Sequence, residues 1–187
     1  MPSPLVAPIT ETLRDFGKPR INRAPSPTLA FSVPWLSVML GSLSPLSLFI
    51  TSAPLLPPLG LLLLLAWQQQ RPGMFPVWAG LPLGLFDDLF SGQPFGSAVL
   101  LWSAVMIGLD LLEARLPWRG VALNWLVASG VVTVYLLLAA LIAQLEAGAV
   151  PLYILAPQVA ISILAYPVAA WFVGLLDRFR LIPIRNL

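Results

Sequence analysis

The sequence predicts an all-α integral membrane protein with six transmembrane helices. Hydrophobic residues make up 58% of the 187 residues, and only ten basic and eight acidic residues are present. In an ordinary soluble domain roughly a quarter of the residues are charged. The few charges also lie mainly between apolar stretches that, at about 20 residues per crossing, provide room for several membrane helices.

Six apolar segments follow an N-terminal region that has no sustained apolar period. Residues 1–30 are rich in proline and charge, which predicts a disordered cytoplasmic tail, and residues 179–187 form a short basic end. Residues 31–178 form the expected transmembrane domain. Proline and glycine separate its spans, which we expect at 31–51, 55–67, 74–90, 95–112, 122–145 and 152–176. The second span is short, so a re-entrant or interfacial segment is an alternative for it.

All ten basic residues fall on one side of this six-span arrangement. They lie in the N-terminal tail, in two of the turns and at the C-terminus: Arg14, Lys18, Arg20, Arg23, Arg71, Arg115, Arg119, Arg178, Arg180 and Arg185. The cytoplasmic side of a membrane protein is the side enriched in Lys and Arg. Both termini of this multi-pass protein are therefore predicted to be cytoplasmic.

The composition excludes much familiar chemistry. The chain has no Cys and no His, so a disulfide, a thiolate or imidazole zinc site, a His-activated nucleophile and a His-ligated haem are excluded. The adjacent acids Asp87 and Asp88 lie about 100° apart on a regular helix and do not converge on one ion. We expect no enzyme activity, no catalytic residue, no cofactor, no metal site and no nucleic-acid partner.

Asp87 and Asp88 are nevertheless unusual, because both lie toward the outer end of the third expected span. A carboxylate inside a membrane is costly, and the C-terminal end of a helix carries partial negative charge that disfavours it further. Two explanations remain open. One aspartate caps the next helix near Phe95 and Gly96 while the other is hydrated, or the charge is removed by protonation or compensated by a cation from another molecule.

Small residues give the same helix a packing surface. Gly80, Gly84 and Asp88 follow each other in steps of four and share one face. The G-x-x-x-G spacing allows another helix to approach closely, and Ala104 with Gly108 offers a similar surface on the fourth span. Packing within the chain is favoured over dimerisation.

The order of these features resembles a known family. The proline-led apolar segment 57–67 (PPLGLLLLLAW) is followed, after a turn, by Gly80 and the block 84–96 (GLFDDLFSGQPFG). This resembles the rod shape-determining protein MreD family, whose pattern is a proline-led span and then G-x-x-x-D-L-x-S-G-x-P-x-G. Asp88 takes the place of the family's aspartate, Asp87 is an addition, and Tyr166-Pro167 with the basic end is similar to the family's last helix. The resemblance singles out Asp88 and Asp87 as expected partner contacts, and as packing and turn residues Gly80, Gly84, Gly92, Pro94, Gly96, Pro57 and Pro167.

The resemblance implies a non-enzymatic component of the bacterial inner membrane that takes part in regulation of cell shape and lateral peptidoglycan synthesis. The implied partners are MreC, RodA with its transpeptidase and, indirectly, MreB, besides the lipid bilayer. The implied fold is similar to the substrate-binding subunits of energy-coupling-factor vitamin transporters. That similarity leaves an alternative function, a small-molecule binding subunit of a transporter.

The charge partition generates a topology prediction. Because the chain has no Cys, single cysteines can be introduced without a background signal. An impermeant maleimide added to intact cells should label cysteines at Gln93 and Gly148 but not at Gln69 or Arg119. Labelling at the last two positions before permeabilisation would contradict the six-span arrangement.

Overall fold

The computed structural model describes residues 27–44, 56–115, 120–148 and 151–181, and these residues form helices joined by turns. The α-helices are α2 (Pro27–Ser42), α3 (Leu59–Gln70), α4 (Gly80–Phe90), α5 (Ser97–Arg115), α6 (Val121–Ala147) and α7 (Ala156–Arg180), with short 3-10 helices η2 (Val77–Ala79) and η3 (Leu152–Leu155) before α4 and α7. The predicted all-α class is confirmed for the described part of the chain.

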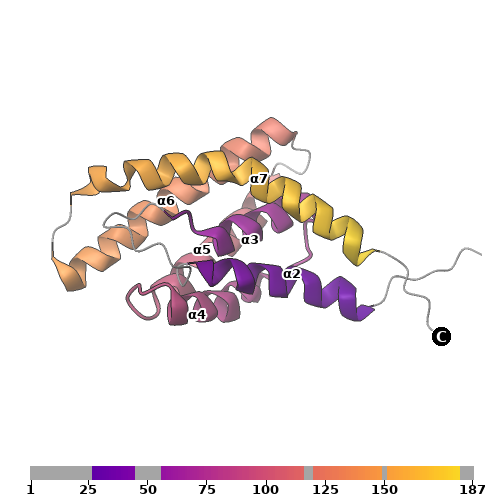
Figure 1. Cartoon of the computed structure of the whole chain (residues 1–187), viewed down its shortest axis with the longest axis horizontal. Helices are drawn as coiled ribbons and strands as arrows, with labels where there is room; N and C mark the ends of the chain where they lie inside the picture. Colours follow the sequence, from indigo (N-terminus) through magenta and orange to yellow (C-terminus); the bar gives the residue numbers. More distant parts are fainter. Residues whose placement is uncertain (1–26, 45–55, 116–119, 149–150, 182–187) are drawn as a thin grey trace, which may run out of the picture.

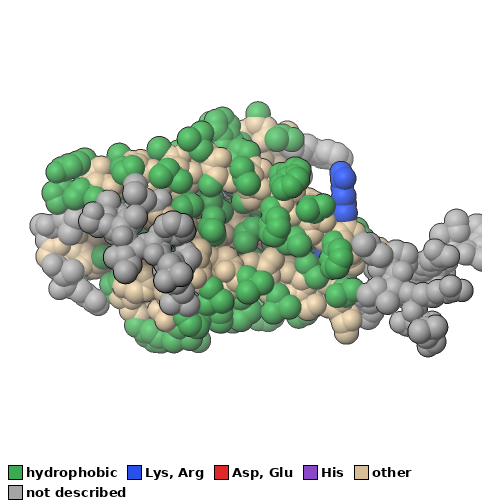
Figure 2. All heavy atoms as spheres, in the orientation of Figure 1, with side chains coloured by type: hydrophobic (Ala, Val, Ile, Leu, Met, Phe, Trp, Pro, Cys, Tyr) green, Lys and Arg blue, Asp and Glu red, His purple; other side chains and the backbone are tan. Residues whose placement is uncertain are grey.

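Three helices are long and apolar enough to cross a membrane. They cover Ser97–Arg115, Val121–Leu145 and Tyr153–Arg180, and the shorter stretch Thr28–Ser42 is also apolar. Apolar side chains are spread over the whole described part of the face seen in Figure 2, and the basic atoms visible there lie toward the end of the molecule where α7 terminates. An apolar surface of this extent is typical of a protein surrounded by lipid, because soluble monomers rarely expose such patches.

Helix α3 forms the centre of the molecule (Figure 1). Every residue from Gly60 to Gln69 is buried, and α3 packs against α2, α6 and α7. Its sequence, LGLLLLLAWQQQ, has no polar face along its first nine residues, so burial on all sides is its most favourable environment. The short second span is therefore an enclosed helix rather than an interfacial one.

The spans expected at 55–67 and 74–90 leave residues 68–73 as a turn, and this is wrong for its first half because α3 continues through Gln70. Helix α7 supplies partners for these amides. The Tyr166 hydroxyl donates to Gln69 Oε1 at 3.0 Å, and Gln70 Nε2 donates to the Ala170 carbonyl at 2.7 Å. Since Gln69 is buried, the exposed Pro72 is the better position for a cysteine that reports this side.

Two helices extend past the segment limits expected from the sequence. Helix α2 begins at Pro27, so the last four residues of the predicted tail are helical, and α7 continues to Arg180, two residues past the expected end of the transmembrane domain. The rest of the predicted tail (1–26), the end of the first span (45–51) and the final residues 182–187 lie outside the described residues.

Prolines inside two helices release carbonyl groups that neighbouring helices use. Proline has no N–H, so a proline in a helix leaves the carbonyl four residues earlier without its donor. Pro34 leaves the carbonyl of Ala30, which accepts from Arg180 at 3.0 Å. Pro167 leaves the carbonyl of Ile163, which accepts from the Trp125 indole at 3.0 Å.

A third interhelical bond involves a carbonyl in the chain before α3. The carbonyl of Leu56, which directly precedes Pro57 and Pro58, accepts from Gln158 Nε2 of α7 at 2.8 Å. Each of these three hydrogen bonds links two separate segments of the chain, and two of the three accepting carbonyls are released by a proline. Prolines that would weaken an isolated helix therefore provide interhelical acceptors here.

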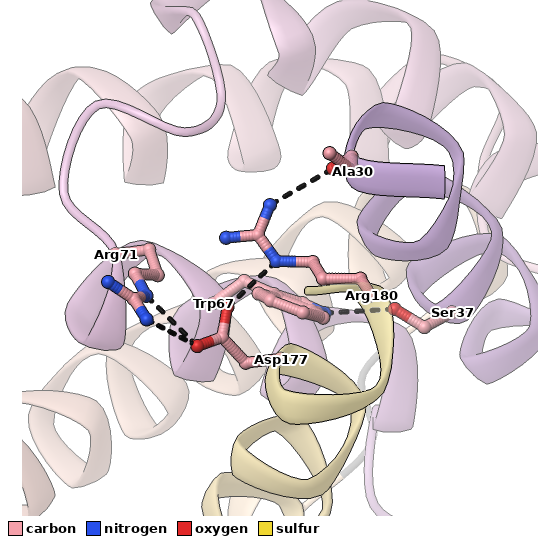
Figure 3. Close-up of polar contacts among 6 residues, drawn as sticks. All are labelled: Ala30, Ser37, Trp67, Arg71, Asp177 and Arg180. Atoms are coloured by element: carbon pink, nitrogen blue, oxygen red, sulfur yellow. Dashed lines mark hydrogen bonds and ion pairs between the residues drawn. The ribbon is translucent and has the colours of Figure 1, made fainter. Parts of the chain in front are cut away.

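An ion-pair cluster joins α2, α3 and α7 at the end of the molecule where α7 terminates (Figure 3). Arg71 donates to Asp177 Oδ2 at 2.6 Å and 3.0 Å, and Arg180 donates to Asp177 Oδ1 at 2.8 Å. The Arg180 guanidinium also lies 5.5 Å from the centre of the Trp67 ring, whose indole donates to Ser37 Oγ at 2.9 Å. Hydrogen bonding to Asp177 raises the pKa of Arg71 further above its already high value. The Asp177 carboxylate is thus shared by two arginines that fix three helices together.

The bond between Trp125 and the carbonyl released by Pro167 can be tested by a double-mutant cycle. Trp125→Phe should lower the free energy of unfolding in detergent by roughly 0.6 to 2 kcal/mol, the range for interhelical hydrogen bonds in membranes. In a Pro167→Ala background the cost should be smaller, because the substituted residue supplies the missing N–H. Trp171→Phe, at an exposed position of α7, is the control. Equal costs in both backgrounds would contradict the assignment.

Candidate functional site

The hairpin formed by α4 and α5 contains the motif residues 80–96. Its two helices approach closely because of glycine. A Cβ added at Gly80 would lie 2.8 Å from the Ser103 Cα, and one added at Gly84 would lie 2.7 Å from the Ala98 carbonyl oxygen. Neither distance is sterically acceptable. The G-x-x-x-G surface therefore packs against α5 within the same chain, as the sequence favoured.

The turn between the helices depends on two further glycines. Gly92 and Gly96 have φ angles of +67° and +91°, a region that other residues adopt only at a cost. Gly92 follows Ser91, the C-cap of α4, as expected for a helix end. The Pro94 carbonyl accepts from the Ser97 N–H at 3.0 Å. The residues predicted to shape this turn lie together in it.

Asp88 caps α5. Its Oδ1 accepts from the Ala98 N–H at 2.8 Å, and its Oδ2 accepts from the N–H groups of Gly96 at 2.9 Å and Val99 at 3.2 Å. The Asp88 side chain, 6% exposed, thus satisfies backbone donors at a helix N-terminus, which also carries partial positive charge. The first of the two sequence explanations holds for Asp88; its contact with a partner stays a prediction.

Asp87 has a different environment, although it is the neighbouring residue. It is 8% exposed, so the expectation that the second aspartate is simply hydrated is wrong. It lies near Asp88, Ser42 of α2 and the Tyr135 hydroxyl of α6. Among the described residues, no arginine forms an ion pair with either aspartate.

Other polar groups surround Asp87. Tyr135 also lies next to Gln93 and to the indole of Trp102. Trp102 is 1% exposed, and both its Nε1 and the Ser42 Oγ are buried without a well-formed hydrogen bond. We refer to Ser42, Asp87, Gln93, Trp102 and Tyr135 as the polar cluster. Its members come from α2, α4, the turn, α5 and α6.

The sequence pointed to only part of this cluster. Asp87 was recognisable as a costly residue, but Ser42, Trp102 and Tyr135 lie on three other helices, and no spacing along the chain connects them. The two remaining motif prolines lie elsewhere, Pro57 before α3 and Pro167 within α7. No group of three or more acidic residues in the described ranges is arranged to hold a metal ion.

Comparison with known proteins returned no match among protein-family models, curated proteins or solved structures. The interpretation of the hairpin and the polar cluster therefore depends on their residues and geometry.

The cap predicts unequal effects of substituting the two aspartates. Asp88→Ala should lower the free energy of unfolding by about 1 to 2 kcal/mol, because it removes an N-cap. Asp88→Asn should have a similar or smaller effect, since one oxygen remains. Asp87→Asn should change stability less, because it removes a buried charge that no described basic residue neutralises. Unfolding in detergent measures all three.

Gly84→Leu is the reference for a disrupted hairpin, because its side chain must displace the backbone of α5. It should lower the amount of protein in the membrane more than any aspartate variant. If Asp88→Ala were as stable as the unsubstituted protein while Asp87→Asn was not, the cap assignment would be overturned.

Proposed function

We propose that this protein is a non-enzymatic component of the bacterial inner membrane that regulates cell shape. It acts in the elongation complex and guides lateral peptidoglycan synthesis by binding MreC, close to RodA and its transpeptidase and indirectly to MreB. Its chain crosses the membrane six times with both termini in the cytoplasm. Its fold is similar to that of the substrate-binding subunits of energy-coupling-factor transporters.

The single observation that carries this proposal is the block 84–96 together with the proline-led segment before it. The block follows the G-x-x-x-D-L-x-S-G-x-P-x-G pattern position by position. The hairpin geometry gives physical reasons for several of these residue types: close approach at Gly84, positive φ at Gly92 and Gly96, and a cap at Asp88. A position-specific pattern in which each of these residues has a distinct structural role arises by chance less often than a similar amino-acid composition.

The charge distribution supports the orientation. The cluster of Arg71, Asp177 and Arg180 lies where α7 ends. Asp88 and the polar cluster lie at the C-terminal end of α4, away from the turn that contains Arg71. Because Lys and Arg favour the cytoplasmic side, the Asp88 end faces outward in this proposal. A partner with an extracytoplasmic domain, such as MreC, would meet the hairpin turn there.

A role in binding rather than in catalysis is supported by the side chains available. The chain has no Cys and no His, and the oxygens of Asp88 already accept backbone hydrogen bonds. A general acid or base needs a titratable group within hydrogen-bond reach of its substrate. Asp88 is held by its cap, which favours a structural role in positioning the hairpin for a partner.

Depletion of the protein in its own cells tests the proposal. Rod-shaped growth should change to wide or rounded cells, and insertion of new wall material along the cell length should become irregular. A plasmid copy should restore the shape, and a copy with Asp110→Asn, an exposed acid of α5 outside the hairpin turn, should restore it equally. Unchanged shape together with a new requirement for a vitamin would instead support the transporter subunit.

A further inference from the structure

An apolar groove runs between α5 and α6. It has a volume of about 470 Å³, and its walls are apolar except for Tyr135. Small residues of both helices line it: Ala104 and Gly108 from α5, and Gly130 from α6. The groove extends from Leu101 near the start of α5 to Leu112 near its end, a length of roughly 16 Å at about 1.5 Å per residue.

The glycines in this groove do not serve packing within the described chain. A Cβ added at Gly108 or Gly130 would meet no atom within 4 Å. At Gly80 and Gly84, by contrast, an added Cβ would lie less than 3 Å from the backbone of α5. Small residues allow close helix approach in membranes, so one pair of glycines is used by α5 and the other pair is open to a further helix.

Two carboxyl groups lie near one end of the groove. Tyr135 both lines the groove and lies near the carboxylates of Asp87 and Asp88. No described arginine pairs with either of them. In a surrounding of low dielectric constant, this end attracts a cationic group and repels the phosphate of a lipid headgroup. Charge and shape together favour an apolar helix with a basic side chain over a phospholipid.

We propose that the α5–α6 groove binds a transmembrane helix of another polypeptide, and that a Lys or Arg of this helix lies beside Tyr135 and Asp87. The basic residue neutralises the polar cluster, and the small residues at 104, 108 and 130 receive the apolar part of the helix. For the identity of the partner, this inference rests on the proposed function. For the surface, it depends only on the groove and its charge.

The proposal can be tested by photocrosslinking in native membranes. A benzoylphenylalanine is placed at Val134, a groove residue that is 55% exposed. It should give an adduct with one membrane protein, whose crosslinked helix carries a Lys or Arg at the end near Asp87. Replacing that basic residue by Gln should reduce the adduct by roughly tenfold, equivalent to about 1.4 kcal/mol. Asp87→Asn should reduce it by a similar factor.

Filling the groove provides a test that does not depend on charge. Gly108→Leu and Gly130→Leu place a side chain in open space, and leucine is a better helix former than glycine. Both variants should keep the protein at its normal abundance and reduce the adduct at least to the level of the charge variants. Ala160→Leu, at an exposed position of α7, should change neither quantity.

The outcomes separate the two proposals. Adducts only with lipid, adducts only with a second copy of this chain, or adducts that Gly108→Leu and Gly130→Leu leave unchanged would overturn the groove assignment. A crosslinked helix with the required basic residue, in a protein unrelated to wall synthesis, would support the groove and contradict the cell-shape function. Rounded cells on depletion, without any helix adduct at Val134, would support the cell-shape function and contradict the groove assignment.

Discussion

In an apolar environment, a backbone carbonyl without a hydrogen-bond donor in its own helix needs a donor from elsewhere. In this chain the bonds that satisfy such carbonyls involve α7. Arg180 donates to the carbonyl that Pro34 releases in α2, and Gln158 donates to the carbonyl that precedes Pro57. The carbonyl that Pro167 releases in α7 itself accepts from Trp125 of α6. Because unsatisfied backbone groups are expensive away from water, each bond fixes the relative position of two helices. The proline content thus becomes a source of interhelical specificity.

The hairpin of α4 and α5 is stabilised in another way. Its contact uses backbone proximity at Gly80 and Gly84, and its turn is closed by Asp88. Glycine contact and capping act between neighbours in sequence, whereas the bonds to α7 join residues 38 to 150 positions apart. The groove lies between α5 of the hairpin and α6, which is tied to α7. Neither kind of interaction fills that space, which leaves small residues facing lipid or a partner.

Adjacent aspartates have separate roles because a helix turns by about 100° per residue. Asp88 points to the N-terminus of α5, where backbone donors satisfy it. Asp87 faces α2 and α6, where Ser42 and Tyr135 are its neighbours. The first residue stabilises the hairpin, and the second leaves a buried carboxyl group near an open groove. A partner cation is therefore proposed beside Asp87 and not beside Asp88, whose carboxylate already accepts backbone hydrogen bonds.

The sequence by itself determined the all-helical apolar class, the approximate position of each helix, the glycine contact within the hairpin and the cap as one of two explanations for the aspartates. These follow from local rules, because hydropathy, proline and glycine act over a few residues. Only the tertiary structure decided that the glutamines 68–70 continue α3, since the amide partners of Gln69 and Gln70 lie on α7 about 100 residues away. The same holds for the polar cluster and the groove, because helices with apolar residues on every side carry no sequence signal of which face meets which neighbour.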